Sequence, residues 1–320
     1  MAQTRNGQKQ HRHHKQQKRR GQQSHRKHSQ QPSARRRLRR EVPSTVAVLA
    51  DAEDFAVMRR YASFSFRDHG ASLRQVDGLL RSLGAQGVHT TVALFDPVDY
   101  EEFCSDAGID PDTAAGRTRY TAETAATGAA VPYRGQPIGR LVPLLIEEAE
   151  RQATWDYATE VLARSGACAD CGEDLGHASF NLASQALRAL IDAVGSGSHH
   201  LVCSVPAGDA PLLAVLHVEC TAGLVRLIEA EALVFCTVLA AGIAADSPGG
   251  LVLRTSAGES PDVVRGWALL KGWLRSLSEG EVFTAYCTDA DTGEPIPPEP
   301  NVEYRAGIDL PPPDDHHRKA

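Results

Sequence analysis

The sequence predicts a mixed α/β protein that carries a disordered, basic N-terminal tail, and three observations predict it. Residues 1–40 contain fourteen of the 34 Lys and Arg and no Asp or Glu. Residues 41–165 alternate short apolar runs with segments of helical period, which is typical of an α/β unit. Residues 166–305 change to extended segments joined by short turns, which is typical of an α+β unit with an antiparallel meander. The two units either stay separate or form one continuous domain, and residues 306–320 form a polar tail.

The first forty residues cannot form a core. They hold one Leu, no aromatic residue and, apart from Thr4, no β-branched residue. Their apolar surface is therefore too small to offset the entropy lost on ordering the backbone. The other 280 residues carry 20 Lys and Arg against all 40 Asp and Glu. A tail of charge +14 is thus joined to a body of charge −20.

Two apolar runs in the first unit, residues 45–50 and 88–95, predict short strands. Between them Ser72 and Gln75 form a capping-box pattern that predicts the start of a helix. Asp96 followed by Pro97 predicts another helix start, because Asp caps the first turn and Pro fits its first position. The order strand, helix, strand, helix predicts a parallel pair of strands.

A long amphipathic helix is predicted over residues 140–164, where apolar residues recur every four positions until Ser165-Gly166. The chain before it, residues 108–139, is rich in Gly, Ala, Thr and Pro and predicts a loop with one helix at residues 120–127. A further helix is predicted over residues 178–194.

Extended segments and turns dominate the second unit. Predicted strands cover residues 199–205, 212–220, 224–230 and 251–255, with a hairpin about Lys271-Gly272. Residues 232–245 form an uncharged run of fourteen residues. A bilayer span needs about twenty, so this run predicts a buried helix and we expect no membrane association. Ser278 and Glu281 form a capping box for a last helix through Tyr286.

Two segments, residues 87–97 (GVHTTVALFDP) and 166–176 (GACADCGEDLG), resemble a group of uncharacterised actinobacterial proteins of unknown function. The resemblance covers most of the body. It implies no activity, cofactor or site residue.

Cys168 and Cys171, followed by Gly172, have the spacing of a zinc knuckle, in which two thiolates bind one metal ion from a tight turn. A redox role is less favoured, because the nearby acids Glu173 and Asp174 oppose thiolate formation. The alternative is two unligated thiols in a loop.

Further zinc ligands are not determined by the sequence. His217 and Cys220 have suitable spacing, but residues three apart on a strand point to opposite faces and cannot chelate together. The remaining candidates are His177, His199, His200 and Cys203.

A cross-strand histidine pair is predicted in the second unit. If Val205 pairs with Leu212, the antiparallel register places His200 opposite His217. Such a pair could bind metal or move protons. Alternatively the two are polar neighbours without a role, and a one-residue slip would separate them.

Asp51 and Asp96 each follow a predicted strand of the first unit. At the carboxyl edge of a parallel sheet they could hold Mg²⁺ for phosphoryl-transfer or nuclease-type chemistry. The same residues are also good helix caps. Asp54 and Asp99 lie three positions beyond them, where capping geometry and the helix dipole favour an acid. Because the sequence contains no Gly-rich phosphate loop, no Gly-x-Ser-x-Gly and no His-Glu-x-x-His, it names no reaction.

The basic arm carries the functional prediction, which is binding of nucleic acid or another polyanion without sequence specificity. Its densest cluster runs from residue 35 to 40. The predicted contact residues are Arg12, Lys15, Lys18, Arg19, Arg20, Arg26, Lys27, Arg35, Arg36, Arg37, Arg39 and Arg40.

Three alternatives stay open. They are a divalent-metal enzyme that uses Asp51 and Asp96, a zinc-stabilised protein-interaction module centred on Cys168 and Cys171, and an arm that folds back on its own acidic body. Seven scattered cysteines and the lack of a secretory signal predict a cytoplasmic location.

Overall fold

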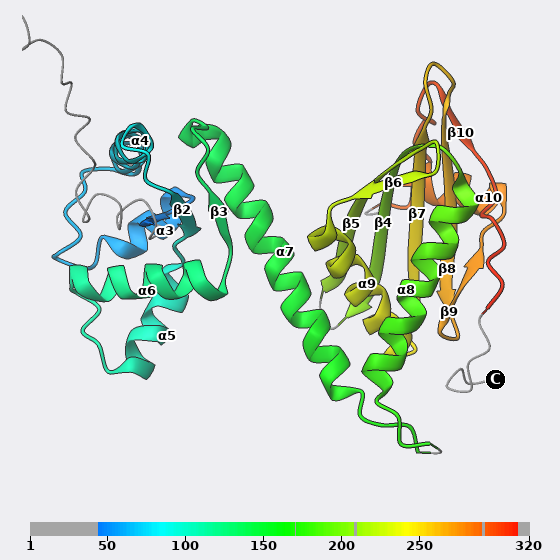
Figure 1. Ribbon diagram of the computed structural model, residues 1–320, viewed down its shortest axis with the longest axis horizontal. Coiled ribbons are helices and arrows are strands. Elements are labelled where there is room, and N and C mark those ends of the chain that lie inside the picture. The colour runs from blue at the N-terminus through cyan, green and yellow to red at the C-terminus, as the bar shows by residue number, and fades with distance from the viewer. Residues whose placement is uncertain (1–43, 170, 208–209, 290–291, 313–320) are drawn as a thin grey trace, which may run out of the picture.

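A computed structural model describes residues 44–169, 171–207, 210–289 and 292–312. These residues form two units of helices and strands that are joined by one long helix, α7 (Ile138–Arg164), as Figure 1 shows. The mixed α/β class is therefore confirmed. The predicted basic arm lies outside the described residues.

The first unit is built on a three-stranded sheet of order β1-β2-β3. Strands β1 (Ser44–Val48) and β2 (Thr90–Leu94) are parallel, with Val46 opposite Val92. The short strand β3 (Ala130–Pro132) is antiparallel to β2. The predicted parallel unit is thus confirmed, and β3 lies in the segment predicted as a loop.

Four helices complete this unit: α3 (Ala52–Met58), α4 (His69–Ala85), α5 (Pro97–Ala107) and α6 (Ala114–Thr127). The capping box predicted at Ser72 is wrong, because Asp68 caps α4 four residues earlier and Ser72 is buried inside the helix. Asp and Ser are caps of similar strength, so the sequence did not choose between them. The predicted helix at 120–127 begins earlier, at residue 114, where Thr113 accepts a hydrogen bond from the Gly116 N–H.

Two clusters of buried side chains hold the unit together. One is aromatic and includes Phe55, Phe95, Tyr100 and Tyr120. The other is aliphatic and is formed by the following residues: Val46, Val48, Leu80, Val92, Leu141 and Leu145. Each such side chain stabilises the fold by about 1.5–3 kcal/mol on burial. Leu141 and Leu145 belong to α7, so the connecting helix completes the core of the first unit.

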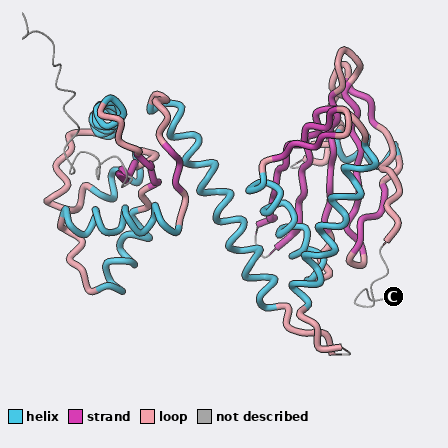
Figure 2. The backbone as a smooth tube through the Cα atoms, viewed as in Figure 1, coloured by secondary structure: helices cyan, strands magenta, loops and turns pink. Residues whose placement is uncertain are grey.

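The second unit has a seven-stranded sheet of order β10-β8-β7-β4-β5-β6, in which β9 also pairs with β8. Its strands are drawn in magenta in Figure 2. The sheet is antiparallel except that β10 runs parallel to β8. The three-residue β10 was not predicted. In chain order the elements are α8 (Leu175–Val194), β4 (Gly197–Ala207), β5 (Ala210–Thr221), β6 (Leu224–Leu227), α9 (Glu229–Ala244), β7 (Gly249–Ser256), β8 (Asp262–Leu270), β9 (Trp273–Ser276), α10 (Glu279–Tyr286) and β10 (Val302–Tyr304).

Helices α8 and α9 cover one face of this sheet, as Figure 1 shows. Leu201, Cys203 and Val205 of β4 point to that face and are buried. Every residue of α9 from Val234 to Gly242 is buried, because the helix packs against strands β4 and β5 and also against helices α7 and α8. The predicted buried helix is confirmed, but α9 begins at residue 229, so the strand predicted over 224–230 is shorter.

The hairpin turn and the capping box predicted near the end of the chain are both confirmed. Lys271 and Gly272 both have positive φ, at 50° and 69°, which is typical of the two-residue turn that joins β8 to β9. Ser278 and Glu281 form a reciprocal capping box at the start of α10.

Candidate functional site

The predicted histidine pair is present on the sheet of the second unit. Val205 pairs with Leu212, and in this register His200 lies directly opposite His217. The Nδ1 atom of His200 is 2.9 Å from Nε2 of His217, and the ring centroids are 4.7 Å apart. Both side chains are on the face opposite α8 and α9, because their neighbours Leu201 and Leu216 are buried toward those helices.

Glu231 of α9 completes this cluster. Strand β6 pairs only with residues 218–221 of β5, so it leaves the backbone N–H of His217 without a strand partner. Glu231 Oε2 accepts that N–H at 3.1 Å and lies 3.3 Å from Nδ1 of the His217 ring. A single carboxylate therefore fixes both the backbone and the ring of His217.

This arrangement assigns the protons. A carboxylate beside Nδ1 favours the proton on that nitrogen, which leaves Nε2 of His217 as an acceptor for Nδ1–H of His200. Burial lowers the pKa of His200, the positive charges of Arg254 and of a protonated His217 lower it further, and the nearby Glu231 carboxylate opposes them. Arg254 lies opposite His200 on β7. Its guanidinium donates to Asp262 at 2.7 Å and to Glu299 at 2.8 Å.

His217 and Glu231 also line a hollow of about 490 Å³ between α7 and the edge of β5. Its walls combine apolar side chains such as Leu144 and Leu213 with the carboxylates of Glu147 and Glu150. The hollow therefore favours cationic or apolar groups over anions.

The paired aspartates of the first unit follow neighbouring parallel strands, as predicted. Asp51 caps α3 and accepts hydrogen bonds from the N–H groups of Glu53 and Asp54. Asp96 caps α5 in the same way. Burial raises the pKa of Asp54, and the charges of Asp51 and Asp96 raise it further. The two strand ends are therefore electrostatically coupled.

The thiol pair lies in a tight hairpin between α7 and α8. The Gly172 N–H donates to the Cys168 carbonyl at 2.8 Å, and the Cys168 N–H donates to the backbone carbonyl of Glu173 at 2.8 Å. Gly172 has φ of +76°, so the glycine after the second thiol supplies the turn. A backbone hydrogen bond from Glu173 lowers the pKa of Cys171, but desolvation and the neighbouring Cys168 outweigh it, and the pKa is raised.

The other predicted zinc ligands do not join this hairpin. The His199 ring is buried against Thr255 and the Gly195 carbonyl. Cys203 is in the core, where burial raises its pKa to about 12. His177 is exposed in the first turn of α8, and His217 and Cys220 point to opposite faces, as predicted. Across the described residues, no three or more His, Cys, Asp or Glu are placed to hold a metal ion.

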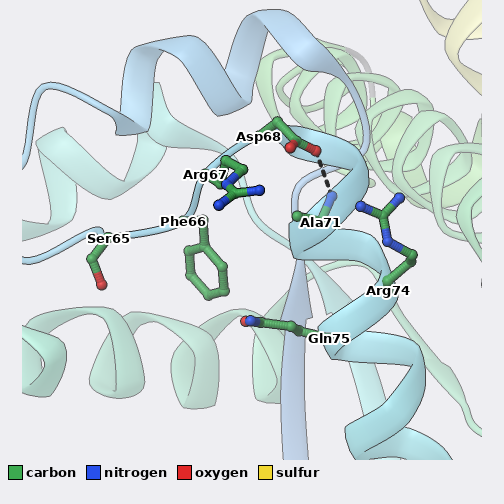
Figure 3. A pocket seen from close by; sticks show the side chains of 7 residues that line it. All are labelled: Ser65, Phe66, Arg67, Asp68, Ala71, Arg74 and Gln75. Atoms are coloured by element: carbon green, nitrogen blue, oxygen red, sulfur yellow. Dashed lines mark hydrogen bonds between the residues drawn. The ribbon is translucent and has the colours of Figure 1, made fainter.

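A hollow of about 520 Å³ lies at the start of α4 (Figure 3). Arg67 and Arg74 line it, and Asp68 turns its carboxylate to the Ala71 N–H at 2.7 Å. Neither arginine forms an ion pair with a residue that the structure describes. Two guanidinium groups with available donors suit a phosphate or carboxylate.

Sequence reasoning missed Glu231, Arg254, Arg67 and Arg74. Glu231 directly precedes the uncharged run of residues 232–245, which predicts a buried helix but no contact for this acid. Its role depends on where β6 ends, which no local pattern specifies. The contact residues predicted in the arm lie outside the described residues.

Residues 33–136 match the family model described as Domain of unknown function (DUF8829). The match spans all three strands of the first unit and ends just before α7. Neither the curated proteins nor the solved structures gave a match. None of the helices in the described part of the chain is long and apolar enough to cross a membrane.

Proposed function

We propose that the protein binds nucleic acid or another polyanion through residues 1–40, without sequence specificity. The observation that carries this proposal is the charge of the arm, fourteen Lys and Arg with no acid among them. Each phosphate that such a segment neutralises releases condensed counterions, which supplies affinity without reading the bases.

Residues 41–320 are acidic, so attraction to phosphate has to come mainly from the arm. Their 40 acids outnumber their 20 Lys and Arg, so the body as a whole repels phosphate. The hollow with Arg67 and Arg74 is a local exception and supports a second, weaker contact with an anion. The arm therefore supplies most of the attraction, and the hollow adds to it.

Binding of duplex DNA or RNA by the full chain and by residues 41–320 tests this proposal. For six to ten phosphate contacts, affinity should fall by about 10³ to 10⁵ between 50 and 200 mM salt. The truncated protein should not bind. Changing Arg35, Arg36, Arg37, Arg39 and Arg40 to Gln should remove much of the salt dependence, whereas changing Gln8, Gln10, Gln16, Gln17 and Gln22 to Ala, which preserves charge, should not. Equal binding by the truncated protein at matched salt would contradict the proposal.

A second candidate is a divalent-metal enzyme of phosphoryl-transfer or nuclease type. It is favoured by the position of Asp51 and Asp96 after two paired parallel strands. Magnesium-dependent cleavage of nucleic acid that is lost in both Asp51→Asn and Asp96→Asn would support it. Cleavage unaffected by either change would exclude these residues.

A third candidate is a zinc-stabilised protein-interaction module centred on Cys168 and Cys171. The tight hairpin with Gly172 at positive φ supports it, because two thiols presented from such a turn suit one tetrahedral ion. Elemental analysis of zinc in the wild type and in the Cys168→Ser, Cys171→Ser double variant tests it.

A further inference from the structure

We propose that His200 and His217 form a binding site for one divalent transition-metal ion, with Glu231 as the group that orients His217. The two imidazoles are the ligands, and water completes the coordination. The site is separate from the arm, the aspartates and the thiol hairpin.

The spacing of the nitrogen atoms fits such an ion. Two metal–nitrogen bonds of about 2.0 Å place their nitrogens about 2.8 Å apart at a right angle and about 3.3 Å apart at the tetrahedral angle. Nδ1 of His200 and Nε2 of His217 are 2.9 Å apart. Small rotations of the two rings would therefore aim both lone pairs at one ion, without a change in the strand register.

Glu231 prepares one ligand in advance. Its carboxylate lies 3.3 Å from Nδ1 of His217 and favours the proton there, so Nε2 keeps its lone pair. Histidine ligands of metal sites are held in this way by a carboxylate on the second ring nitrogen. Glu231 is itself fixed by the backbone N–H of His217 and does not need to move.

Metal binding requires one proton to move. In the neutral pair Nδ1 of His200 carries the hydrogen that it donates to His217. When the ion binds at Nδ1, this proton leaves that nitrogen and one is taken up at Nε2 of the same ring. Binding of the ion to the neutral histidine pair therefore releases no net proton. Binding to a pair that carries one additional proton releases that additional proton.

The surrounding charges favour a cation. Arg254 is the positive group that faces His200, and it is paired with both Asp262 and Glu299. Glu231 adds a carboxylate beside His217, and Glu219, on the same strand, accepts a hydrogen bond from Ser198 at 2.6 Å. The His217 side chain is 60% exposed, so a hydrated ion can reach it.

The experiment is a thermal melt of the full-length protein titrated with NiCl₂, chosen because nickel(II) suits nitrogen ligands and is not reduced by thiols. The chain has 13 His, several of them in the arm. The melting midpoint distinguishes nickel bound at His200 and His217 from nickel bound by the arm. An ion stabilises the protein only where it binds the native state more tightly than the unfolded state. Nickel held by the arm should not raise the midpoint.

We expect the wild-type midpoint to rise with nickel by several degrees, and His200→Gln and His217→Gln each to lose this rise. Glu231→Gln should need about ten- to a hundredfold more nickel for the same rise. His89→Gln, a change of another exposed histidine, is the matched control and should behave as wild type. Midpoints without nickel report whether each variant is folded. If folded His200→Gln and His217→Gln proteins show the wild-type rise, or the wild type shows none, the proposal is wrong.

Discussion

At the scale of single residues, Asp51 and Asp96 can act either as helix caps or as metal ligands, and the two roles make different demands on the side chain. Asp51 and Asp96 both accept backbone N–H groups at helix starts, which explains why a side-chain oxygen is favoured there without any metal. A cap needs only an acceptor oxygen, whereas a metal ligand needs negative charge. Asn keeps the first property and loses the second.

Substitution of Asp96 separates these roles. Asp96→Ala should lower the free energy of unfolding by about 1 kcal/mol, because the first turn of α5 loses its acceptor. Asp96→Asn keeps an acceptor oxygen, so its free energy of unfolding should be close to that of the wild type. Urea unfolding of the two variants and wild type measures this. Equal losses in both variants would show that charge, and not capping, is what the position supplies.

A pH-dependent contribution is expected from Glu281. The backbone N–H of Ser278, together with Arg275 and the Ser278 hydroxyl, lowers its pKa from 4.5 to about 2. Because the folded pKa lies below the unfolded value, the stabilisation is complete above about pH 4.5 and is lost as the pH falls toward 2. The difference in unfolding free energy between wild type and Glu281→Gln should therefore shrink over that window. A difference that stays constant from pH 6 to pH 3 would contradict the assignment.

At the scale of elements, sequence patterns predicted the features that depend on neighbouring residues. They missed the features that depend on contacts between residues distant in the sequence. Val205 of β4 pairs with Leu212 of β5, the pairing on which the predicted histidine pair depended, and the alternation of apolar residues buries one face of both strands. The capping box of α10 was also predicted. The short strand β10 was not, because its three residues are held by β8 across some forty positions of sequence. Glu231, whose carboxylate contacts His217, was also missed, because that contact depends on where β6 ends.

The hairpin between α7 and α8 gives a prediction at this scale. Protein purified without chelator should contain up to one equivalent of zinc at Cys168 and Cys171, because the turn presents both thiols to one ion. The Cys168→Ser, Cys171→Ser double variant should lose it in elemental analysis. A Cys104→Ser variant, which changes a buried thiol of the first unit, is the control. Identical metal content in all three proteins would leave the pair as ordinary thiols.

At the scale of the whole molecule, charge and burial are divided along the chain. Apolar burial is concentrated in the three clusters of the two units, whereas positive charge is concentrated in residues 1–40. Stability and polyanion binding should therefore respond to different changes.

Removing residues 1–40 should leave the cooperative thermal unfolding of the rest nearly unchanged at moderate salt. Attraction between exposed charges contributes about 0–1 kcal/mol per pair and is screened over roughly 10 Å at 0.1 M salt. Melting of the full chain and of residues 41–320 at low and high salt measures this. A large loss that persists at high salt would show that the arm is packed structure.

Helix α7 has a consequence for how the chain can be divided. The family match ends at residue 136, but Leu141 and Leu145, both fully buried, close the aliphatic cluster over β1 and β2. Farther along the same helix, Ala158 is buried in the core of the second unit. A cut at the edge of the family match would therefore remove Leu141 and Leu145 from the aliphatic cluster over the small sheet, and a cut within α7 would split a helix that both cores share. The segment that matches a family and the segment that folds as a unit therefore end at different residues, and helix α7, which lies beyond the match, is shared by both cores.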